Sequence, residues 1–337
     1  MFFKRNYFYV VILIYIAGIL FSCQSPKKPD NLSKINLKTH LFYKELFDTP
    51  PDSISNKIPY FINTYPTFFE IFGNNVIHIG FPNEKKYGYL LQQFISDYQM
   101  RTVYNDIQKQ YKQLDDINQQ LNQAFQYFSY YFPSKAIPEI FYYHGGFNQS
   151  IITTDSLIGI GLDKYLGSNY TYYARLGLPV YQTLKMRKEY IAVDALRYYA
   201  YGIFPFNFQN ETVLSHLIYE AKIQYLLDAV FPDMKDTIKF GFSGRQLSWC
   251  QKSERSMWQF LIDKKKLFSN DRMEIKRYTN DGPFTTTFPQ ESPARAAVWM
   301  AYNIVKQYMQ RQPDKTLEQL MNETNEQKIV QESEYNP

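Results

Sequence analysis

Four histidines are the first residues of this 337-residue chain that could support metal chemistry. A zinc peptidase of the commonest helical type carries His-Glu-x-x-His, because a four-residue spacing places two imidazoles on one helix face. The chain lacks this motif. Its histidines are dispersed along the sequence: His40, His78, His144 and His216. His216 and Glu220 share a helix face, but two ligands without a third do not make a site, so we interpret them as an ordinary pair.

Cys250 is a candidate nucleophile, but its neighbours argue against that role. It follows Leu247 and precedes Met257 and Leu261 on one stripe of a predicted helix, with no histidine nearby in sequence. Free cysteines usually pack as small apolar residues, and we predict the same here. The glycine-containing stretches 145–150 and 159–167 lack the spacing of a phosphate-binding loop. We expect no cofactor and no metal site.

A long polar loop begins with Asn280, Asp281, Gly282 and Pro283 and continues as "FTTTFPQESPAR". Loops of this length between helices often carry function, which makes these four residues a candidate contact loop. A second interpretation is compatible with the first: the four residues form a turn, Ser292 caps the next helix and Pro293 occupies its first position.

The elements that position these residues are mainly helical. Apolar residues at helical spacing predict helices over 102–132, 187–203, 211–230, 244–268 and 294–311. Ser243 and Gln246 have the spacing of a capping box at the start of the fourth of these helices. Two β-branched and aromatic runs, 136–148 and 150–163, predict a pair of strands. This order of elements predicts an α+β fold, a mainly helical single domain with a small sheet.

The N-terminus has the layout of an export signal. Lys4 and Arg5 precede an apolar run over 7–21, which is shorter than a bilayer-spanning helix requires. Leu20 to Cys23 resembles a lipobox, so we predict a signal peptide over 1–22, palmitate-type acylation of Cys23, a flexible tether over 23–39 and a body over 40–337. The alternatives are an ordinary signal peptide with an incidental cysteine, or an uncleaved anchor helix. Lipid on Cys23 would leave Cys250 without a disulfide partner.

Composition narrows the classes of partner. Lys and Arg are scattered among the acids rather than gathered in a stripe, which argues against a nucleic-acid-binding protein. The sequence itself predicts one partner, the membrane that the N-terminal lipid would contact.

Several longer stretches resemble the gliding motility lipoprotein GldB family. They are 65–82, 158–167, 217–233, 241–271 and 278–309. The resemblance implies an envelope lipoprotein of gliding bacteria, required by machinery linked to the type IX secretion system and partnered by other proteins of that machinery. We place it on the periplasmic face of the outer membrane, because Gln24 is not the aspartate that retains some lipoproteins at the inner membrane.

A weaker resemblance is to predicted zinc-dependent proteases with a zincin-like fold. There, a His-Glu-x-x-His helix is followed by a helix that bears a glutamate ligand. In this alignment Glu220 matches the glutamate, Val193 and Arg197 stand where the histidines belong, and Asp194 replaces the general base. Arginine stays protonated and repels metal. The resemblance therefore implies a zincin-like fold without zinc, with Asp194, Arg197 and Glu220 as an ion-paired remnant of the cleft.

Two functions follow from these resemblances. The first is a non-catalytic structural or assembly component of the gliding machinery, with the remnant cleft and the contact loop as its surface. The second is a surviving hydrolase that acts on peptide or cell wall, with Glu220, Asp194 and Asp281 as carboxylates of separated pKa. At least two of these carboxylates converging in an open pocket would favour the enzyme, whereas a salt bridge to Arg197 that closes the pocket would favour the scaffold.

Overall fold

The computed structural model describes residue 29 and residues 31–337. The predicted signal peptide over 1–22, the acylated Cys23 and the start of the predicted tether lie outside the described residues. In the part of the chain that is described, no helix combines the length and the apolar character that crossing a bilayer requires.

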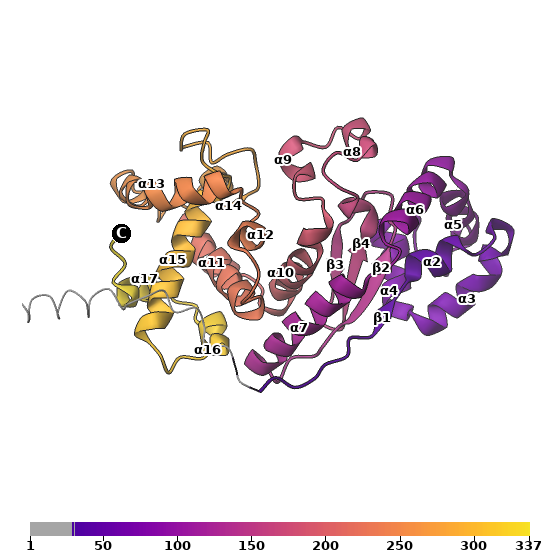
Figure 1. Cartoon of the computed structure of the whole chain (residues 1–337), viewed down its shortest axis with the longest axis horizontal. Helices are drawn as coiled ribbons and strands as arrows, with labels where there is room; N and C mark the ends of the chain where they lie inside the picture. The colour runs from indigo at the N-terminus through magenta and orange to yellow at the C-terminus, as the bar shows by residue number, and fades with distance from the viewer. Residues whose placement is uncertain (1–28, 30) are drawn as a thin grey trace, which may run out of the picture.

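A four-stranded mixed sheet lies in the first half of the chain (Figure 1). Its strands are β1 (Thr39–His40), β2 (Glu139–Tyr143), β3 (Ile151–Thr153) and β4 (Leu157–Gly161). Their order is β1-β2-β4-β3, in which β1, β2 and β4 run parallel and β3 pairs antiparallel with β4. β2 and β4 are buried almost along their whole length, as expected when helices cover both faces of a sheet.

Aromatic rings fill both faces of the sheet. Phe141 stacks on Phe68 with ring centroids 4.2 Å apart, on the side covered by the N-terminal helices. Tyr142 points to the opposite face, where its hydroxyl donates to Asn118 at 2.7 Å. This alternation follows from the two-residue repeat of a strand. It divides the N-terminal half into layers on either side of β2.

The N-terminal half also contains helices and short helical turns. They are α2 (Phe42–Phe47), η1 (Pro51–Ser53), α3 (Ile54–Thr64), α4 (Pro66–Ile71), η2 (Phe72–Val76), α5 (Tyr87–Ser96), α6 (Tyr98–Gln110), α7 (Asp115–Tyr131), η3 (Leu162–Tyr165), α8 (Thr171–Arg175), α9 (Val180–Thr183) and η4 (Lys188–Tyr190). Of these, α2 and η3 contact β2.

The C-terminal half is a helical assembly around α11 (Figure 1). Its elements are α10 (Ile191–Ile203), η5 (Phe208–Asn210), α11 (Val213–Val230), α12 (Asp236–Phe240), α13 (Gly244–Asp263), α14 (Arg272–Thr279), α15 (Ala296–Arg311), α16 (Leu317–Asn322) and α17 (Glu326–Ser333). Most residues of α11 are buried, because α7, α10, α14 and α15 surround it. A helix that other helices surround lies at the centre of its fold. One core cluster joins both halves. The structure is mainly helical with a small mixed sheet.

Several predicted elements are present with small shifts at their ends. The predicted helices over 187–203, 211–230 and 244–268 correspond to η4 with α10, to α11 and to α13. The predicted capping box is confirmed, since Ser243 and Gln246 exchange side-chain and backbone hydrogen bonds. The prediction that Ser292 caps the helix over 294–311 is wrong. That helix, α15, begins at Ala296, whose N–H donates to the hydroxyl of Thr285 from within the preceding loop.

The single helix predicted over 102–132 is in fact two helices, α6 and α7. The chain leaves helical geometry at Tyr111, whose φ is −108° and ψ is 50°. Its ring is buried and its hydroxyl donates to the Tyr165 carbonyl at 2.6 Å. The helix resumes at Asp115, where acidic side chains favour a helix N-terminus. Burial of one tyrosine therefore overrides a continuous helical pattern.

The predicted strand pair is also corrected. The run over 150–163 contains two strands, β3 and β4, because Thr154 accepts hydrogen bonds from the N–H groups of Ser156 and Leu157 and closes a turn. The predicted tether ends earlier than expected. Leu37 is buried and its N–H donates to Asn122 at 2.9 Å, so the packed body starts before residue 40.

Candidate functional site

A cavity of about 330 Å³ lies where α10 and α12 face the α9–η4 segment and the loop over 280–295. Figure 1 shows α8, α9 and this loop along the same edge of the molecule. The side chains come from distant parts of the sequence, which is typical of a binding cleft. We call this cavity the cleft.

α10 supplies one wall of the cleft through a single stripe of side chains. Asp194, Arg197, Tyr198 and Tyr201 are spaced by three, one and three residues, which places them on one helix face. The opposite face packs toward the sheet and α7. The same helix that anchors the fold therefore positions polar groups in the cleft.

Asp194 is a carboxylate in a place that disfavours its charge. Burial raises the pKa of Asp194 to about 6, although Arg197, Tyr165 and Lys185 oppose the rise. The Tyr165 hydroxyl donates to Asp194 Oδ2 at 2.9 Å. Desolvation without a direct cationic partner explains the direction of this shift.

Arg197 is only 8% exposed and lies between two neutral acceptors. Its Nη2 donates to Gln224 Oε1 at 3.1 Å and to the Lys239 carbonyl at 2.5 Å. Its Nη1 is buried and has no hydrogen-bond partner. A buried donor without a hydrogen bond costs about 1–3 kcal/mol.

Arg295 is the residue that directly precedes α15, and it lines the cleft. Its φ of 63° is left-handed, a conformation that few non-glycine residues adopt. Its Nη2 forms an ion pair with Glu220, which also accepts from the Tyr201 hydroxyl at 2.8 Å. Burial alone would lower the pKa of Arg295, but Glu220 more than reverses this and raises it. Arg295 Nε is buried without a partner.

Asp281 closes the rim of the cleft with Lys185. Lys185 Nζ lies 2.9 Å from Asp281 Oδ1. Burial alone would raise the pKa of Asp281, but Lys185 and Arg295 outweigh it and hold the pKa below its usual range. Asp194 and Asp281 therefore line one cavity with pKa values shifted in opposite directions.

The structure brings together most of the residues singled out in the sequence, with one change of pairing. Asp194, Arg197 and Asp281 line the same cleft. The expected ion-paired remnant is corrected, because Glu220 pairs with Arg295 and the bonds of Arg197 go to Gln224 and the Lys239 carbonyl. Two carboxylates thus converge in the cleft, and among the ion pairs of the described residues none closes it through Arg197.

The contact loop divides between two roles. The N–H of Asn280 donates to the Lys276 carbonyl and ends α14. Gly282 and Pro283 line a second hollow of about 420 Å³, which adjoins the cleft at Lys185 and Gly241. We call this hollow the groove.

Sequence reasoning missed Lys185, Arg295 and Tyr165. Lys185 and Tyr165 come from short turns without a periodic pattern. Arg295 lies two residues after Pro293, in a loop without a periodic pattern. No spacing in the sequence indicates that these three side chains meet α10.

The remaining early candidates have structural roles. His144 and Asp163 form a fully buried pair with 3.3 Å between Nδ1 and Oδ2. His216 stacks on Phe206 and pairs with Glu211 at 3.2 Å, whereas Glu220 pairs with Arg295. Within residues 31–337, no three His, Cys, Asp or Glu side chains come together to hold a metal ion.

Cys250 packs inside the core. Its side chain is fully buried, and burial raises the pKa of its thiol to about 12. The thiol is therefore protonated at neutral pH, whereas a nucleophilic cysteine is a thiolate.

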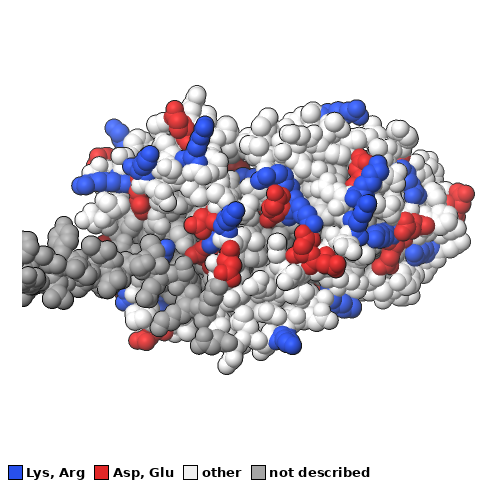
Figure 2. Space-filling model, in the orientation of Figure 1, with Lys and Arg blue, Asp and Glu red and all other residues white. Residues whose placement is uncertain are grey.

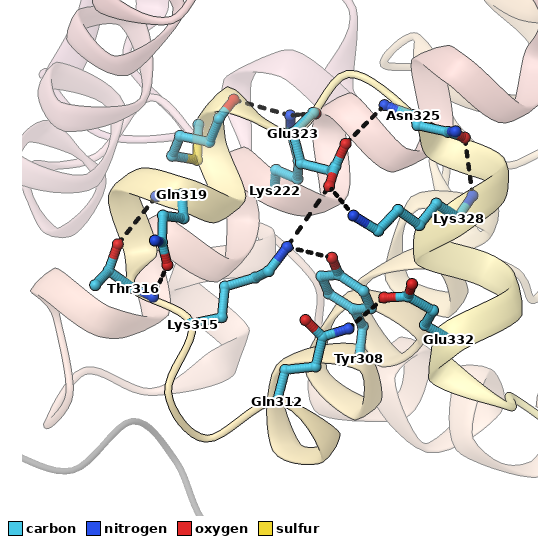
Figure 3. A network of polar contacts seen from close by, with 11 residues as sticks. Lys222, Tyr308, Gln312, Lys315, Thr316, Gln319, Glu323, Asn325, Lys328 and Glu332 are labelled. Atoms are coloured by element: carbon cyan, nitrogen blue, oxygen red, sulfur yellow. Dashed lines mark hydrogen bonds and ion pairs between the residues drawn. The ribbon is translucent and has the colours of Figure 1, made fainter.

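A second cavity of about 280 Å³ adjoins α11 and α16. Lys222 Nζ donates to the Met321 and Glu323 carbonyls at 2.9 and 2.8 Å. Burial lowers the pKa of Lys222 to about 8. Figure 3 shows that Lys222 points from α11 to the chain between α16 and α17. Its bonds tie these three helices together.

Glu323 is the centre of the network in Figure 3. Its carboxylate lies 3.0 Å from Lys328 Nζ and 3.6 Å from Lys315 Nζ, and accepts from the Asn325 N–H at 3.2 Å. Burial alone would raise the pKa of Glu323, but Lys328 and the Asn325 N–H outweigh it and hold the pKa below its ordinary value. The network stabilises the C-terminal helices.

Replacing Glu323 with glutamine is expected to lower the free energy of unfolding by about 1–2 kcal/mol at pH 7. The stability from Glu323 is present above its unfolded pKa of 4.5 and is lost as pH falls through the lower folded pKa. Urea unfolding at several pH values measures the difference, which should vanish in acid. Glu334→Gln is the control, because its pair with Arg311 is exposed and should contribute less than about 0.5 kcal/mol. Equal losses in both variants would contradict the prediction.

Side chains of both signs cover the face of the molecule shown in Figure 2. Lys and Arg alternate with Asp and Glu across it, without a broad region of one sign.

A family model described as Gliding motility protein GldB matches residues 24–337. No curated protein matches the chain significantly, and no solved structure does.

Proposed function

The chain belongs to the GldB family of gliding motility lipoproteins, and from this premise we propose that it acts in the cell envelope as a non-catalytic component of the gliding machinery. In this proposal Cys23 carries lipid, the protein sits on the periplasmic face of the outer membrane, and it works with the type IX secretion apparatus. The family match over nearly the whole chain after Cys23 supports these assignments.

The observation that carries a binding role is the pair of arginines in the cleft. Arg197 and Arg295 each hold one buried guanidinium nitrogen without a hydrogen-bond partner. A site that performs its work by contact needs unmet groups that a partner can satisfy. The groove extends this surface to Gly282 and Pro283 in the contact loop.

We also propose that the fold descends from a zincin-like one. α10 packs against α11, and the two helices carry Asp194, Arg197 and Glu220 close to one cleft. That arrangement supports descent from a metallopeptidase helix pair.

A hydrolase is the second candidate, and one observation favours it. Asp194 and Asp281 line the same cleft with pKa values shifted in opposite directions, which is the arrangement that acid/base chemistry requires. In this reading, Asp194 is the acid and Asp281 the base.

Movement of cells that carry Asp194→Asn separates the two functions. Asparagine keeps the size of the side chain and an acceptor for Tyr165 but cannot transfer a proton. We expect these cells to spread at the wild-type rate with normal protein abundance. Loss of spreading at normal abundance would support the hydrolase and contradict the non-catalytic role.

A bulky residue in the groove tests the contact surface. Gly282 has room for a β-carbon, whose nearest neighbours would be the Phe284 carbonyl at 3.7 Å and Ala294 at 3.9 Å. We expect Gly282→Leu to abolish spreading by filling the groove, and Gly282→Ala to leave it unchanged. Normal spreading with Gly282→Leu would show that the groove is not the contact surface.

A further inference from the structure

Three large apolar side chains are exposed where α13 ends and α14 begins. Phe268 is 63% exposed, Met273 is 65% exposed and Ile262 is 48% exposed. Lys266 joins the two helices at this point, because its Nζ lies 3.2 Å from Glu274 Oε2. The three apolar side chains therefore belong to one compact turn of the chain.

Backbone hydrogen bonds hold this turn against the start of α11. The N–H of Leu214 donates to the Leu267 carbonyl at 2.8 Å, and the N–H of Val213 donates to the Ser269 carbonyl at 2.9 Å. Leu267 is also buried. Phe268 lies between these two fixed residues, so its exposure is a feature of the fold and not of a loose loop.

The same segment carries an excess of positive charge. Residues 262–277 contain six basic and three acidic side chains, and we call this segment the basic corner. Glu274 pairs with Lys266 and Arg277. Across residues 31–337, no side-chain hydrogen bond or ion pair includes the other four cations of the corner, which are Lys264, Lys265, Arg272 and Lys276.

The carboxylates nearby do not cancel this excess. Asp263 is exposed, and Asp271 caps α14 by accepting from the Met273 N–H at 2.8 Å. Glu211, just before α11, adds one acid and lies 3.2 Å from His216. Six basic side chains then face four acidic ones, which leaves two positive charges.

Lys265 occupies a position where glycine is the usual residue. Its φ is 51°, and its N–H donates to the Ile262 carbonyl at 2.8 Å, which closes the end of α13. Helices commonly end in a left-handed residue, most often glycine, because a β-carbon is disfavoured there. A cation favours a helix C-terminus, but Lys264 and Lys266 already supply one. The fold alone therefore does not explain a lysine at this position.

Exposed apolar side chains beside unpaired Lys and Arg are typical of a surface that enters the headgroup layer of a bilayer. Anionic headgroups attract such cations, and the apolar side chains leave water. The predicted lipid on Cys23 would hold a bilayer close to the body. The charge and the exposed apolar groups of the corner are thus complementary to an anionic lipid surface.

We infer that the basic corner docks on a membrane surface that contains anionic lipid. Phe268, Met273 and Ile262 enter the headgroup region, and the four unpaired cations lie against lipid phosphates. The corner lies at the opposite end of the molecule from α5 and α6, so docking would orient the body on the membrane (Figure 1). This contact goes beyond the proposed function, because it uses neither the cleft nor the groove.

A fluorophore at position 268 tests the contact on the full chain reconstituted in vesicles. Phe268→Cys is labelled with an environment-sensitive dye, and Cys250 should resist labelling because its thiol is fully buried and protonated. Tyr98→Cys is the matched control, because Tyr98 is 80% exposed at the start of α6. Vesicles of phosphatidylcholine with about a third phosphatidylglycerol should reduce acrylamide quenching at position 268 about threefold, compared with phosphatidylcholine alone. Quenching at position 98 should be equal in both.

Three results would overturn the inference. The first is equal quenching at position 268 in both kinds of vesicle. The second is equal protection at positions 98 and 268, which would mean that the body has no preferred side. The third is protection in native envelopes without protection in vesicles of pure lipid, which would assign the corner to a protein partner.

Charge variants of the labelled chain identify the groups that bind. Lys264→Gln with Lys265→Gly should remove at least half of the protection at position 268. Its thermal unfolding temperature should not fall, because glycine suits the left-handed position. Lys85→Gln with Lys86→Gln makes the same change in charge beside α5 and should leave protection unchanged. Unchanged protection in the first variant, or an equal loss in both, would overturn the role of these lysines.

The vesicle measurement is independent of the movement of cells. It changes no residue of the cleft or the groove. A failed result would therefore reject membrane docking by the basic corner and leave the proposed function standing.

Discussion

Alanine in place of Asp228 is expected to lower the free energy of unfolding by about 3 kcal/mol. Asp228 on α11 forms an ion pair with Lys239 on α12, and the two side chains are only 9% and 4% exposed. Asp228 Oδ2 also accepts from the Tyr302 hydroxyl at 2.8 Å. Alanine leaves the ammonium of Lys239 buried with a weaker partner, which is why the loss is large.

Asp236 limits the expected loss of stability and also provides the control. Its Oδ1 lies 3.0 Å from Lys239 Nζ, but its side chain is 63% exposed. Because Asp236 remains, the expected loss lies at the lower end of the range for broken buried pairs. Asp236→Ala should change the free energy of unfolding by less than about 1 kcal/mol. Guanidinium unfolding compares the two variants, and similar losses in both would refute the assignment.

The double variant Asp228→Leu with Lys239→Met should recover most of the lost stability. It removes both charges and keeps apolar volume, which is often neutral or stabilising. The pair also bears on the cleft, since the Lys239 carbonyl accepts from Arg197.

Helical elements of this fold were predictable where burial follows one face. α13 begins at the predicted capping box, because Ser243 and Gln246 satisfy each other locally. α11 was also found, although it is buried on most sides, because apolar residues recur along its whole length. Local chemistry and simple periodicity thus account for these helices.

Elements fixed by distant contacts escaped prediction. The break at Tyr111 depends on the carbonyl of Tyr165, which lies 54 residues further along the chain. β1 consists of two residues, too short for a strand pattern, and pairs with β2 at Ile140 and Phe141. The start of α15 depends on the Thr285 hydroxyl in the preceding loop. None of these contacts leaves a signal in its own segment.

The residues of the cleft divide in the same way, into those that a local pattern indicates and those that distant contacts position. Asp194 and Arg197 could be singled out because they lie on one helix at positions where the resemblance expects metal chemistry. Lys185 and Arg295 could not, because their positions depend on the α9–η4 turn and on a left-handed residue before α15. The corrected pairing of Glu220 with Arg295 follows directly from that missing residue.

Asparagine in place of Asp194 is expected to raise the free energy of unfolding by up to about 3 kcal/mol at pH 7.5. Burial raises the folded pKa of Asp194 from 3.8 to about 6. A carboxyl group with a raised folded pKa favours the native state below the unfolded pKa, and this contribution is lost as pH rises through the folded value. The wild type therefore carries an unfavourable charge at neutral pH, and the variant does not.

Urea unfolding between pH 3.5 and 8 measures the difference. The two proteins should have equal stability below about pH 4, and the variant should gain stability through pH 6. Asp281→Asn is the matched control, because Lys185 and Arg295 lower the pKa of Asp281. That variant should lose stability at neutral pH, by a small amount because its side chain is 48% exposed. A loss of stability in Asp194→Asn would contradict the expected sign.

The same variant gives the clearest test of what the carboxylate does in the cell. A protein made more stable by Asp194→Asn cannot fail through misfolding, so any defect in spreading would come from the lost charge itself. Retained spreading would assign Asp194 to the wall of a binding cleft. Lost spreading would mean that the carboxylate of Asp194 itself is needed, and the hydrolase would then gain support over a passive wall.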